Sequence, residues 1–185
     1  MNVQSELVQR NRKFAANFKG GLPILPKLRT VLVTCLDPRV DPAHVLGLEL
    51  GDAVVIRNTG GRVTDSVIDE IATLAVMVNK ASQGRESGFH VLLMHHTQCG
   101  AQQLADPQLQ STLREKLGID VSAYAITDQQ TDLRNDVEKL MNARTIPDAV
   151  SISALVYDVK SGQVEEILET KPLSQLRTSL ATAAF

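Results

Sequence analysis

Short apolar runs and amphipathic stretches alternate along most of this chain. Four runs rich in Val, Ile and Leu end at turn-forming or polar residues, which indicates strands buried on both faces; they lie at 31–35, 53–57, 89–94 and 149–157. Between them, apolar residues recur every three or four positions, which indicates helices, over 67–78, 109–117 and 133–141. This alternation predicts an α/β fold with a mainly parallel central sheet flanked by helices.

The two ends of the chain add to this plan. Residues 2–19 carry Val3, Leu7 and Phe14 at roughly helical spacing and predict an amphipathic helix that needs a surface to pack on. A turn at 160–162 returns the last core strand into 164–168, which predicts an antiparallel edge strand. The segment 121–126 fits either a short strand or an extended link.

We expect a single domain over 1–185, since its length suits one hydrophobic core. It divides into an N-terminal arm at 1–20, a core at 29–170 and a tail at 171–185. The expected sheet order is 2-1-3-4 plus the antiparallel edge strand. This order brings the carboxyl ends of the first and third strands together, where such sheets bind ligands.

Composition excludes several classes of function. A net charge of −2, 3% aromatic residues and no tryptophan argue against a nucleic-acid partner. No apolar run approaches the roughly 20 residues that span a bilayer, and the first 20 residues are too polar for a signal peptide. We therefore expect a cytoplasmic protein without a membrane partner. In that reducing compartment, the two cysteines favour metal binding or catalysis over a disulfide.

Residues that can bind a metal lie at the ends of two predicted strands. The first strand ends in Cys35, and the third is followed by His96 and Cys99, whose H-x-x-C spacing lets one turn supply two ligands. Two thiolates and one imidazole are the donors that zinc prefers, and three protein ligands leave a fourth position for water or substrate. The alternative is that both cysteines are ordinary buried thiols and His96 is a hydrogen-bonded core residue.

Asp37 and Arg39 leave the first strand beside Cys35, because Pro38 cannot continue the ladder. Asp37 can accept a hydrogen bond from a metal-bound hydroxide, and Arg39 can keep that carboxylate ionised and oriented. Such a hydroxide attacks a small electrophilic carbon. The alternative is an ion pair that only stabilises the turn.

Three further features carry weaker signals. Gly60 and Gly61 follow the second strand and permit a positive φ or a close approach of the backbone to a ligand, which makes them candidate substrate-pocket residues. His95 should point away from His96 because side chains alternate along a strand, and we expect it to pack or to support the site. Structural roles are expected for His44 and His90.

The segments Cys35-Leu36-Asp37-Pro38-Arg39 and His96-Thr97-Gln98-Cys99-Gly100 resemble the paired C-x-D-x-R and H-x-x-C motifs of the β-class carbonic anhydrases. The His95-His96-Thr97 form, the loop 57–61 and the hairpin 156–162 are similar to the short, archaeal-like branch of that family. The resemblance implies zinc on Cys35, His96 and Cys99, an Asp37–Arg39 dyad, and reversible hydration of carbon dioxide to bicarbonate and a proton. It also implies a homodimer, or a higher homo-oligomer, with the site near the subunit interface.

The fourth zinc position stays open at this stage, because in some family members the aspartate that matches Asp37 occupies it in place of water. Pro38 and Gln98 depart from the family pattern at positions that are not ligands. Because of these two departures, two other functions remain as alternatives. One is hydrolysis of a related electrophile, carbonyl sulfide or carbon disulfide, on the same zinc; the other is a non-catalytic zinc- or bicarbonate-binding protein.

Overall fold

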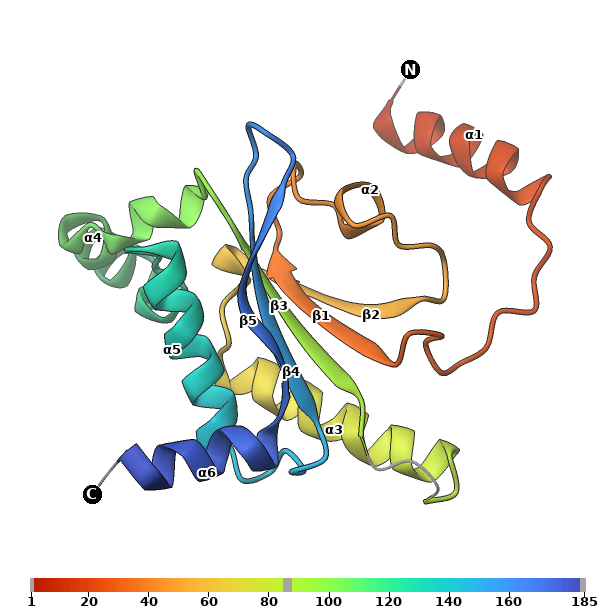
Figure 1. Cartoon of the computed structure of the whole chain (residues 1–185). Helices are drawn as coiled ribbons and strands as arrows, with labels where there is room; N and C mark the ends of the chain where they lie inside the picture. The colour runs from red at the N-terminus through yellow and green to blue at the C-terminus, as the bar shows by residue number, and fades with distance from the viewer. Residues whose placement is uncertain (1, 85–87, 184–185) are drawn as a thin grey trace.

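The fold is built on a five-stranded sheet with the order β2-β1-β3-β4-β5 (Figure 1). The computed structural model describes residues 2–84 and 88–183. The first four strands are parallel and β5 runs antiparallel to β4. Their bounds are Thr30–Cys35 for β1, Ala53–Asn58 for β2, His90–His96 for β3, Ser151–Tyr157 for β4 and Val164–Pro172 for β5. The predicted fold class and strand order are confirmed.

Helices cover the two faces of the sheet unequally. In Figure 1, α3, α5 and α6 lie on one side of the sheet and the short α2 lies on the other. The helices are α1 Val3–Ala15, α2 Pro42–Val45, α3 Asp65–Ala81, α4 Pro107–Leu117, α5 Gln129–Asn142 and α6 Leu173–Ala183. Three 3-10 turns lie at Thr59–Gly61, Gly100–Ala105 and Ser122–Tyr124.

Alternation along β1 places its side chains in two separate cores. Val31 and Val33 pack with Ile71 of α3 and with apolar residues of α5, whereas Leu32 packs with Met94 and Val40 on the α2 side. Because β1 lies in the middle of the sheet, both faces are buried, which explains why its sequence reads as a continuous apolar run. The strand is therefore held rigidly up to its last residue, Cys35.

The chain differs from expectation at several element boundaries. Helix α1 ends at Ala15 rather than near 19, and a long connection leads from it to β1. The segment 121–126, expected to be a short strand or an extended link, contains a 3-10 turn at Ser122–Tyr124. Strand β5 continues to Pro172, and α6 follows directly within the segment expected to be a tail. No helix in the described part of the chain is long and apolar enough to cross a membrane.

The N-terminal arm stands apart from the body (Figure 1). Helix α1 is capped by the Asn2 side chain, which accepts a hydrogen bond of 2.8 Å from the backbone N–H of Ser5. None of the residues of Val3–Ala15 is buried within the described chain. Phe14 and Phe18 stack on each other with ring centroids 5.3 Å apart, and both remain about half exposed. The predicted apolar face is present and unpaired within a single chain.

Candidate metal centre

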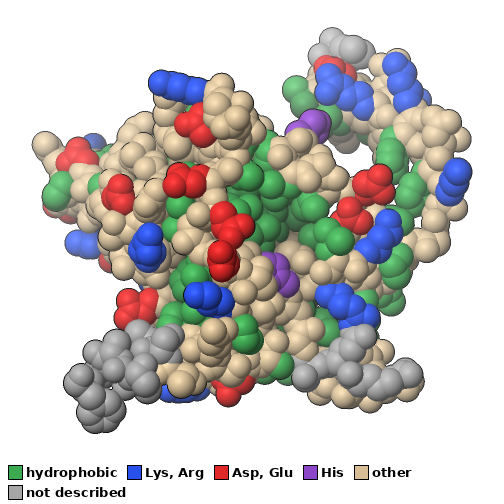
Figure 2. Space-filling model, in the orientation of Figure 1, with side chains coloured by type: hydrophobic (Ala, Val, Ile, Leu, Met, Phe, Trp, Pro, Cys, Tyr) green, Lys and Arg blue, Asp and Glu red, His purple; other side chains and the backbone are tan. Residues whose placement is uncertain are grey.

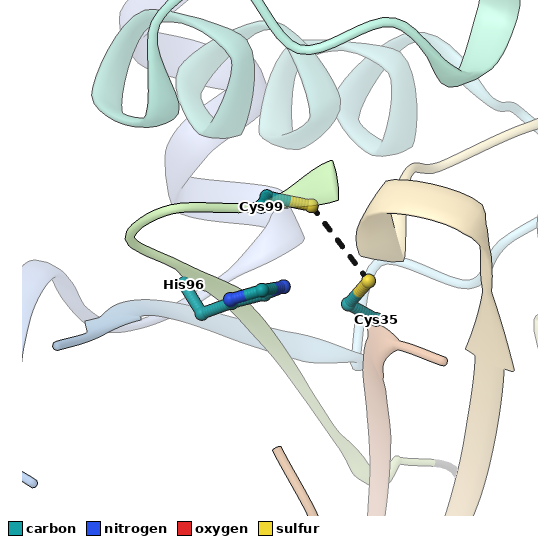
Figure 3. Close-up of side chains that lie close together, drawn as sticks. All are labelled: Cys35, His96 and Cys99. Carbon is teal, nitrogen blue, oxygen red and sulfur yellow. Dashed lines mark hydrogen bonds between the residues drawn. The ribbon is translucent and has the colours of Figure 1, made fainter. Parts of the chain in front are cut away.

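The carboxyl ends of β1 and β3 bring three ligand-type side chains together. These strands are parallel neighbours, and Cys35 and His96 are their last residues. Cys99 lies in the turn that follows β3, and its Sγ is 3.8 Å from the Sγ of Cys35 (Figure 3). The two sulfur atoms and one ring nitrogen of His96 all lie within 4.8 Å of one another, and all three residues are buried.

The geometry of this group fits a zinc ion. The Nδ1 atom of His96 lies 3.0 Å from the carbonyl oxygen of Thr97, so Nδ1 carries the proton and donates it there. This leaves Nε2 as a bare lone pair that is buried without a hydrogen-bond partner among the described residues. A tetrahedral ion with Zn–S bonds of about 2.3 Å separates its two sulfur ligands by about 3.8 Å. The orphaned nitrogen and the spacing of the sulfurs both match that requirement.

The two thiols differ in how readily they lose a proton. The pKa of Cys35 is lowered to about 4, mainly because the Cys99 thiol donates a hydrogen bond to it. The backbone N–H groups of Asp37 and Gly60 also donate to Cys35 and, with the nearby His96 ring, outweigh the opposing effect of burial on its pKa. The pKa of Cys99 is raised, because it supplies the shared proton. A dication would remove that proton and bind both sulfurs as thiolates.

Asp37 and Arg39 form a bidentate ion pair at the mouth of the group. Arg39 Nε donates to Oδ1 of Asp37 at 2.9 Å, and Arg39 Nη2 donates to Oδ2 at 2.7 Å. The backbone N–H of Arg39 also donates to Oδ1, at 2.9 Å. The Arg39 side chain is the main reason that the pKa of Asp37 is lowered to about 2. Oδ2 lies 4.0 Å from Nε2 of His96, so an ionised carboxylate faces the position that a metal would occupy.

The two residues that depart from the family pattern lie on this turn. Pro38 is exposed and is not one of the three ligand-type residues. Gln98 adopts a left-handed backbone with φ of 54°, and its carbonyl oxygen accepts a hydrogen bond of 3.0 Å from Arg39 Nη2. Gln98 therefore helps to hold Arg39 through its backbone, which any side chain at this position could also do.

Two polar residues that sequence reasoning did not assign also hold the turns in place. Arg57, at the end of β2, donates to the carbonyl oxygens of Cys35 at 3.0 Å and Asp37 at 2.7 Å. The Thr97 hydroxyl accepts from the backbone N–H of Val159 at 3.1 Å, which ties the turn after β3 to the β4–β5 hairpin. The signal for Arg57 was present, because it is the only charged residue in an otherwise apolar strand.

Gly60 and Gly61 approach protein backbone closely. Both are buried and have positive φ, at 78° and 67°. A Cβ on Gly61 would lie 2.7 Å from the backbone nitrogen of Cys35, and one on Gly60 would lie 2.9 Å from the carbonyl oxygen of Tyr124. The loop is wedged against the end of β1. A role for these glycines in a substrate pocket stays a prediction.

The remaining histidines lie away from the ligand group. His95 is buried on the opposite side of β3 from His96, with Nε2 3.4 Å from Oδ2 of Asp136. His90 lies between the hydroxyls of Ser151 and Ser153, at 3.0 and 2.8 Å. The side chain of His44 is 86% exposed and lies 3.4 Å from Asp41. None of the three belongs to the described Cys35–His96–Cys99 group.

The parallel sheet and the Cys-His-Cys group together define the class of protein. A family model described as carbonic anhydrase matches residues 30–164. A relative that aligns with 90% of the chain is a β-class enzyme. The chain therefore belongs to the β-carbonic anhydrase family.

Individual relatives place the chain more closely. It is 30% identical over 169 residues to β-carbonic anhydrase 1 of Mycobacterium tuberculosis, covering 90% of this chain and 99% of that one. The solved carbonic anhydrase of Streptococcus mutans is 33% identical with a TM-score of 0.74, covering 90% of this chain and 98% of that one. A carbon disulfide hydrolase of Acidithiobacillus thiooxidans is 24% identical over 177 residues, covering 83% of each chain.

More distant neighbours share the fold alone. The tetrameric β-carbonic anhydrases of Sordaria macrospora are represented at 22% identity with a TM-score of 0.55, covering 91% of this chain and 92% of that one. The family thus includes oligomeric members.

Proposed function

We propose that this chain hydrates carbon dioxide reversibly to bicarbonate and a proton, with zinc bound by Cys35, His96 and Cys99. The observation that carries the proposal is the buried, unpartnered Nε2 of His96, which faces two thiols 3.8 Å apart beside an ionised carboxylate. Membership of the β-carbonic anhydrase family supports the same reaction.

The dyad orients the attacking water. Zinc, when bound, supplies the positive charge that makes water nucleophilic near neutral pH. Asp37 accepts a hydrogen bond from that water and thereby fixes the direction of its lone pair toward the carbon of the substrate. Arg39 holds both oxygens of Asp37 in place, so the carboxylate loses little rotational entropy during the reaction. The water's oxygen becomes part of bicarbonate, and its proton passes to buffer.

Stopped-flow hydration of carbon dioxide, with zinc determined on the same sample, tests the proposal. Asp37→Asn keeps the shape of the side chain but weakens acceptance from water, so kcat/KM should fall about 100-fold while zinc remains bound. Asp106→Asn is the matched control, because Asp106 only caps α4 by accepting from Gln108 N–H. A parent protein with full zinc and no hydration would refute the proposal, and equal rates for the two variants would refute the role of Asp37.

Hydrolysis of carbon disulfide or carbonyl sulfide is the second candidate function. The relative from Acidithiobacillus thiooxidans, a carbon disulfide hydrolase, supports it. The same donor set and dyad would serve, since all three substrates are small linear electrophiles. Assay of the zinc-loaded protein with each gas, followed by sulfide release, separates the two. Full zinc with no turnover on any substrate would instead favour a non-catalytic zinc- or bicarbonate-binding role.

We further propose that the chain forms a homodimer or a higher homo-oligomer. Strand β2 is an edge strand of the described sheet, and Val55 within it is 41% exposed. Apolar grooves flank it, one lined by Leu50 and Val55 and another lined by Val54, Leu74 and Met77. Figure 2 shows hydrophobic side chains along the arm and on the face of the body beside it. A second copy would cover these surfaces.

Light scattering after size exclusion tests this assembly. Phe14→Glu with Phe18→Glu places charges on the apolar face of the arm and should shift the protein toward monomers. Leu117→Glu is the control, since Leu117 is 62% exposed on α4. A parent that is monomeric at micromolar concentration would contradict the proposal.

We also propose a cytoplasmic location, since the two free, buried thiols need a reducing compartment to stay available to metal.

A further inference from the structure

A buried carboxylate on α5 lies behind the two strand ends that carry the ligand-type residues. Asp136 is completely buried. Its Oδ2 accepts from Arg62 Nε at 2.7 Å, and its Oδ1 accepts from Lys139 Nζ at 2.9 Å and from Arg62 Nη2 at 3.2 Å. Asp136 is three residues after Leu133 and four before Leu140, so it occupies the apolar face of the helix.

One side of this cluster leads to Cys35. Arg62 directly follows Gly61, where an added Cβ would lie 2.7 Å from the backbone nitrogen of Cys35. The Asn58 side chain accepts from the Arg62 backbone N–H and donates to its carbonyl oxygen, both at 2.8 Å. The guanidinium of Arg62 also donates to the carbonyl oxygen of Ala125. Arg62 is 5% exposed, and its Nη1 also lies 3.3 Å from Oδ1 of Asp132, so its pairing with Asp136 helps to hold the loop against the end of β1.

The other side of the cluster leads to His96. His95 precedes it in β3 and points to the opposite face of the sheet, where its Nε2 lies 3.4 Å from the same Oδ2 of Asp136. His95 is 1% exposed, and its ring has no closer polar partner among the described residues. One carboxylate thus contacts residues next to the ends of both ligand-bearing strands.

Stability alone does not account for this arrangement. Burial raises the pKa of Asp136, but the nearby His95 ring and the hydrogen bonds from Arg62 and Lys139 outweigh it and lower the pKa to about 2. The group is therefore an ion without access to water, and such pairs often stabilise a fold no better than apolar residues of similar volume. What an apolar residue could not do is hold the Arg62 loop by directed hydrogen bonds while lying against His95 of β3.

We infer that Asp136 is a positioning residue, which sets the separation of Cys35 and His96 through Arg62 and His95 and thereby governs how tightly zinc is held. The inference rests on the zinc site proposed above. It concerns metal retention rather than the hydration step, so the two can fail separately.

The test compares three variants of the zinc-loaded protein. Asp136→Asn removes the charge, and Arg62→Lys keeps a positive charge but loses the two-pronged contact. Val137→Ala is the matched control, because it removes apolar packing from the neighbouring position of α5 without touching the cluster. Zinc transfer to a chromophoric chelator, the visible spectrum of the cobalt-substituted protein and the melting temperature are measured for each.

Asp136→Asn and Arg62→Lys should release zinc about 10-fold faster than the parent, with altered cobalt bands. Val137→Ala should melt at a lower temperature and release zinc at the parent rate. The inference would be overturned if the first two variants released zinc at the parent rate. It would also be overturned if the zinc release rates of all three variants simply followed the fall in their melting temperatures. If Asp136→Asn does not fold, Arg62→Lys decides alone. A parent that binds zinc but does not hydrate carbon dioxide would remove the proposed function and leave this inference standing; a parent that binds no zinc would remove both.

Discussion

Replacing Gly61 with alanine should lower the free energy of unfolding more than the same substitution at a left-handed glycine with open space around it. With φ at 67°, alanine costs about 1–2 kcal/mol of folding free energy from the backbone conformation alone. The new Cβ would also lie 2.7 Å from the nitrogen of Cys35 and 2.8 Å from the carbonyl carbon of Thr34. Both atoms are backbone in a buried central strand, so a displacement of the kind seen in overpacked cores adds about 1–3 kcal/mol.

Gly162 provides the matched control. Its φ is 75°, and a Cβ built there meets nothing within 4 Å. Gly162→Ala should therefore lose only the conformational part, about 1–2 kcal/mol. Urea unfolding of both variants measures the difference, which should be about 1–3 kcal/mol, or about 1 M in the midpoint. Gly61→Ala should also release zinc faster, because Cys35 has moved. Equal losses of unfolding free energy in the two variants would refute the argument that the loop is wedged against β1.

Three other outcomes follow from the site. Arg39→Lys should lower kcat for hydration about 10-fold and raise the pKa of Asp37, because a lysine cannot contact both carboxylate oxygens. Its zinc content, measured by atomic absorption, should stay at the parent level. Removing zinc by dialysis against a chelator should lower the melting temperature, and zinc but not magnesium should restore it, since thiolates favour the softer ion. The pKa of Asp136 is about 2 in the folded protein and 3.8 ordinarily, so its ionisation adds about 2 kcal/mol to the free energy of unfolding. This contribution is present above about pH 4 and is lost as pH falls through about 2. Urea unfolding at several pH values should show that Asp136→Asn weakens the loss of stability at acid pH.

The sheet was predictable from sequence because its strands are buried on both faces. Val31 to Cys35 is made of β-branched and other residues that favour strands, and charged side chains appear only after the strand has ended. The gathering of Cys35, His96 and Cys99 followed from the predicted strand order, since parallel neighbours end at the same edge. The amphipathic stretch predicted over 109–117 lies within helix α4, where Asp106 caps the start and Gly118 ends the helix with φ of 67°.

Features that depend on tertiary contacts were not predictable. Asp136 received no role from the sequence, although its spacing from Leu133 and Leu140 places it on the face of the helix that meets the core. Its partner Arg62 lies 74 residues away in sequence, and no local pattern joins the two. The tail gave no clear periodic signal, yet α6 docks through Leu173 and Leu176, and Arg177 donates to carbonyl oxygens of the α5 end.

The spacing of the ligand-type residues along the chain also orders the events of biosynthesis. Cys35 and Cys99 are 64 residues apart, and they meet only after β1 and β3 have paired. The segment 95–99 brings His95, His96 and Cys99 close in an unfolded chain, but Cys35 is absent from it, so we expect a low affinity for zinc before folding. With the zinc site proposed above, the ion would then bind to a chain that has already folded, and a cell short of zinc would accumulate a folded, empty protein that regains metal without refolding.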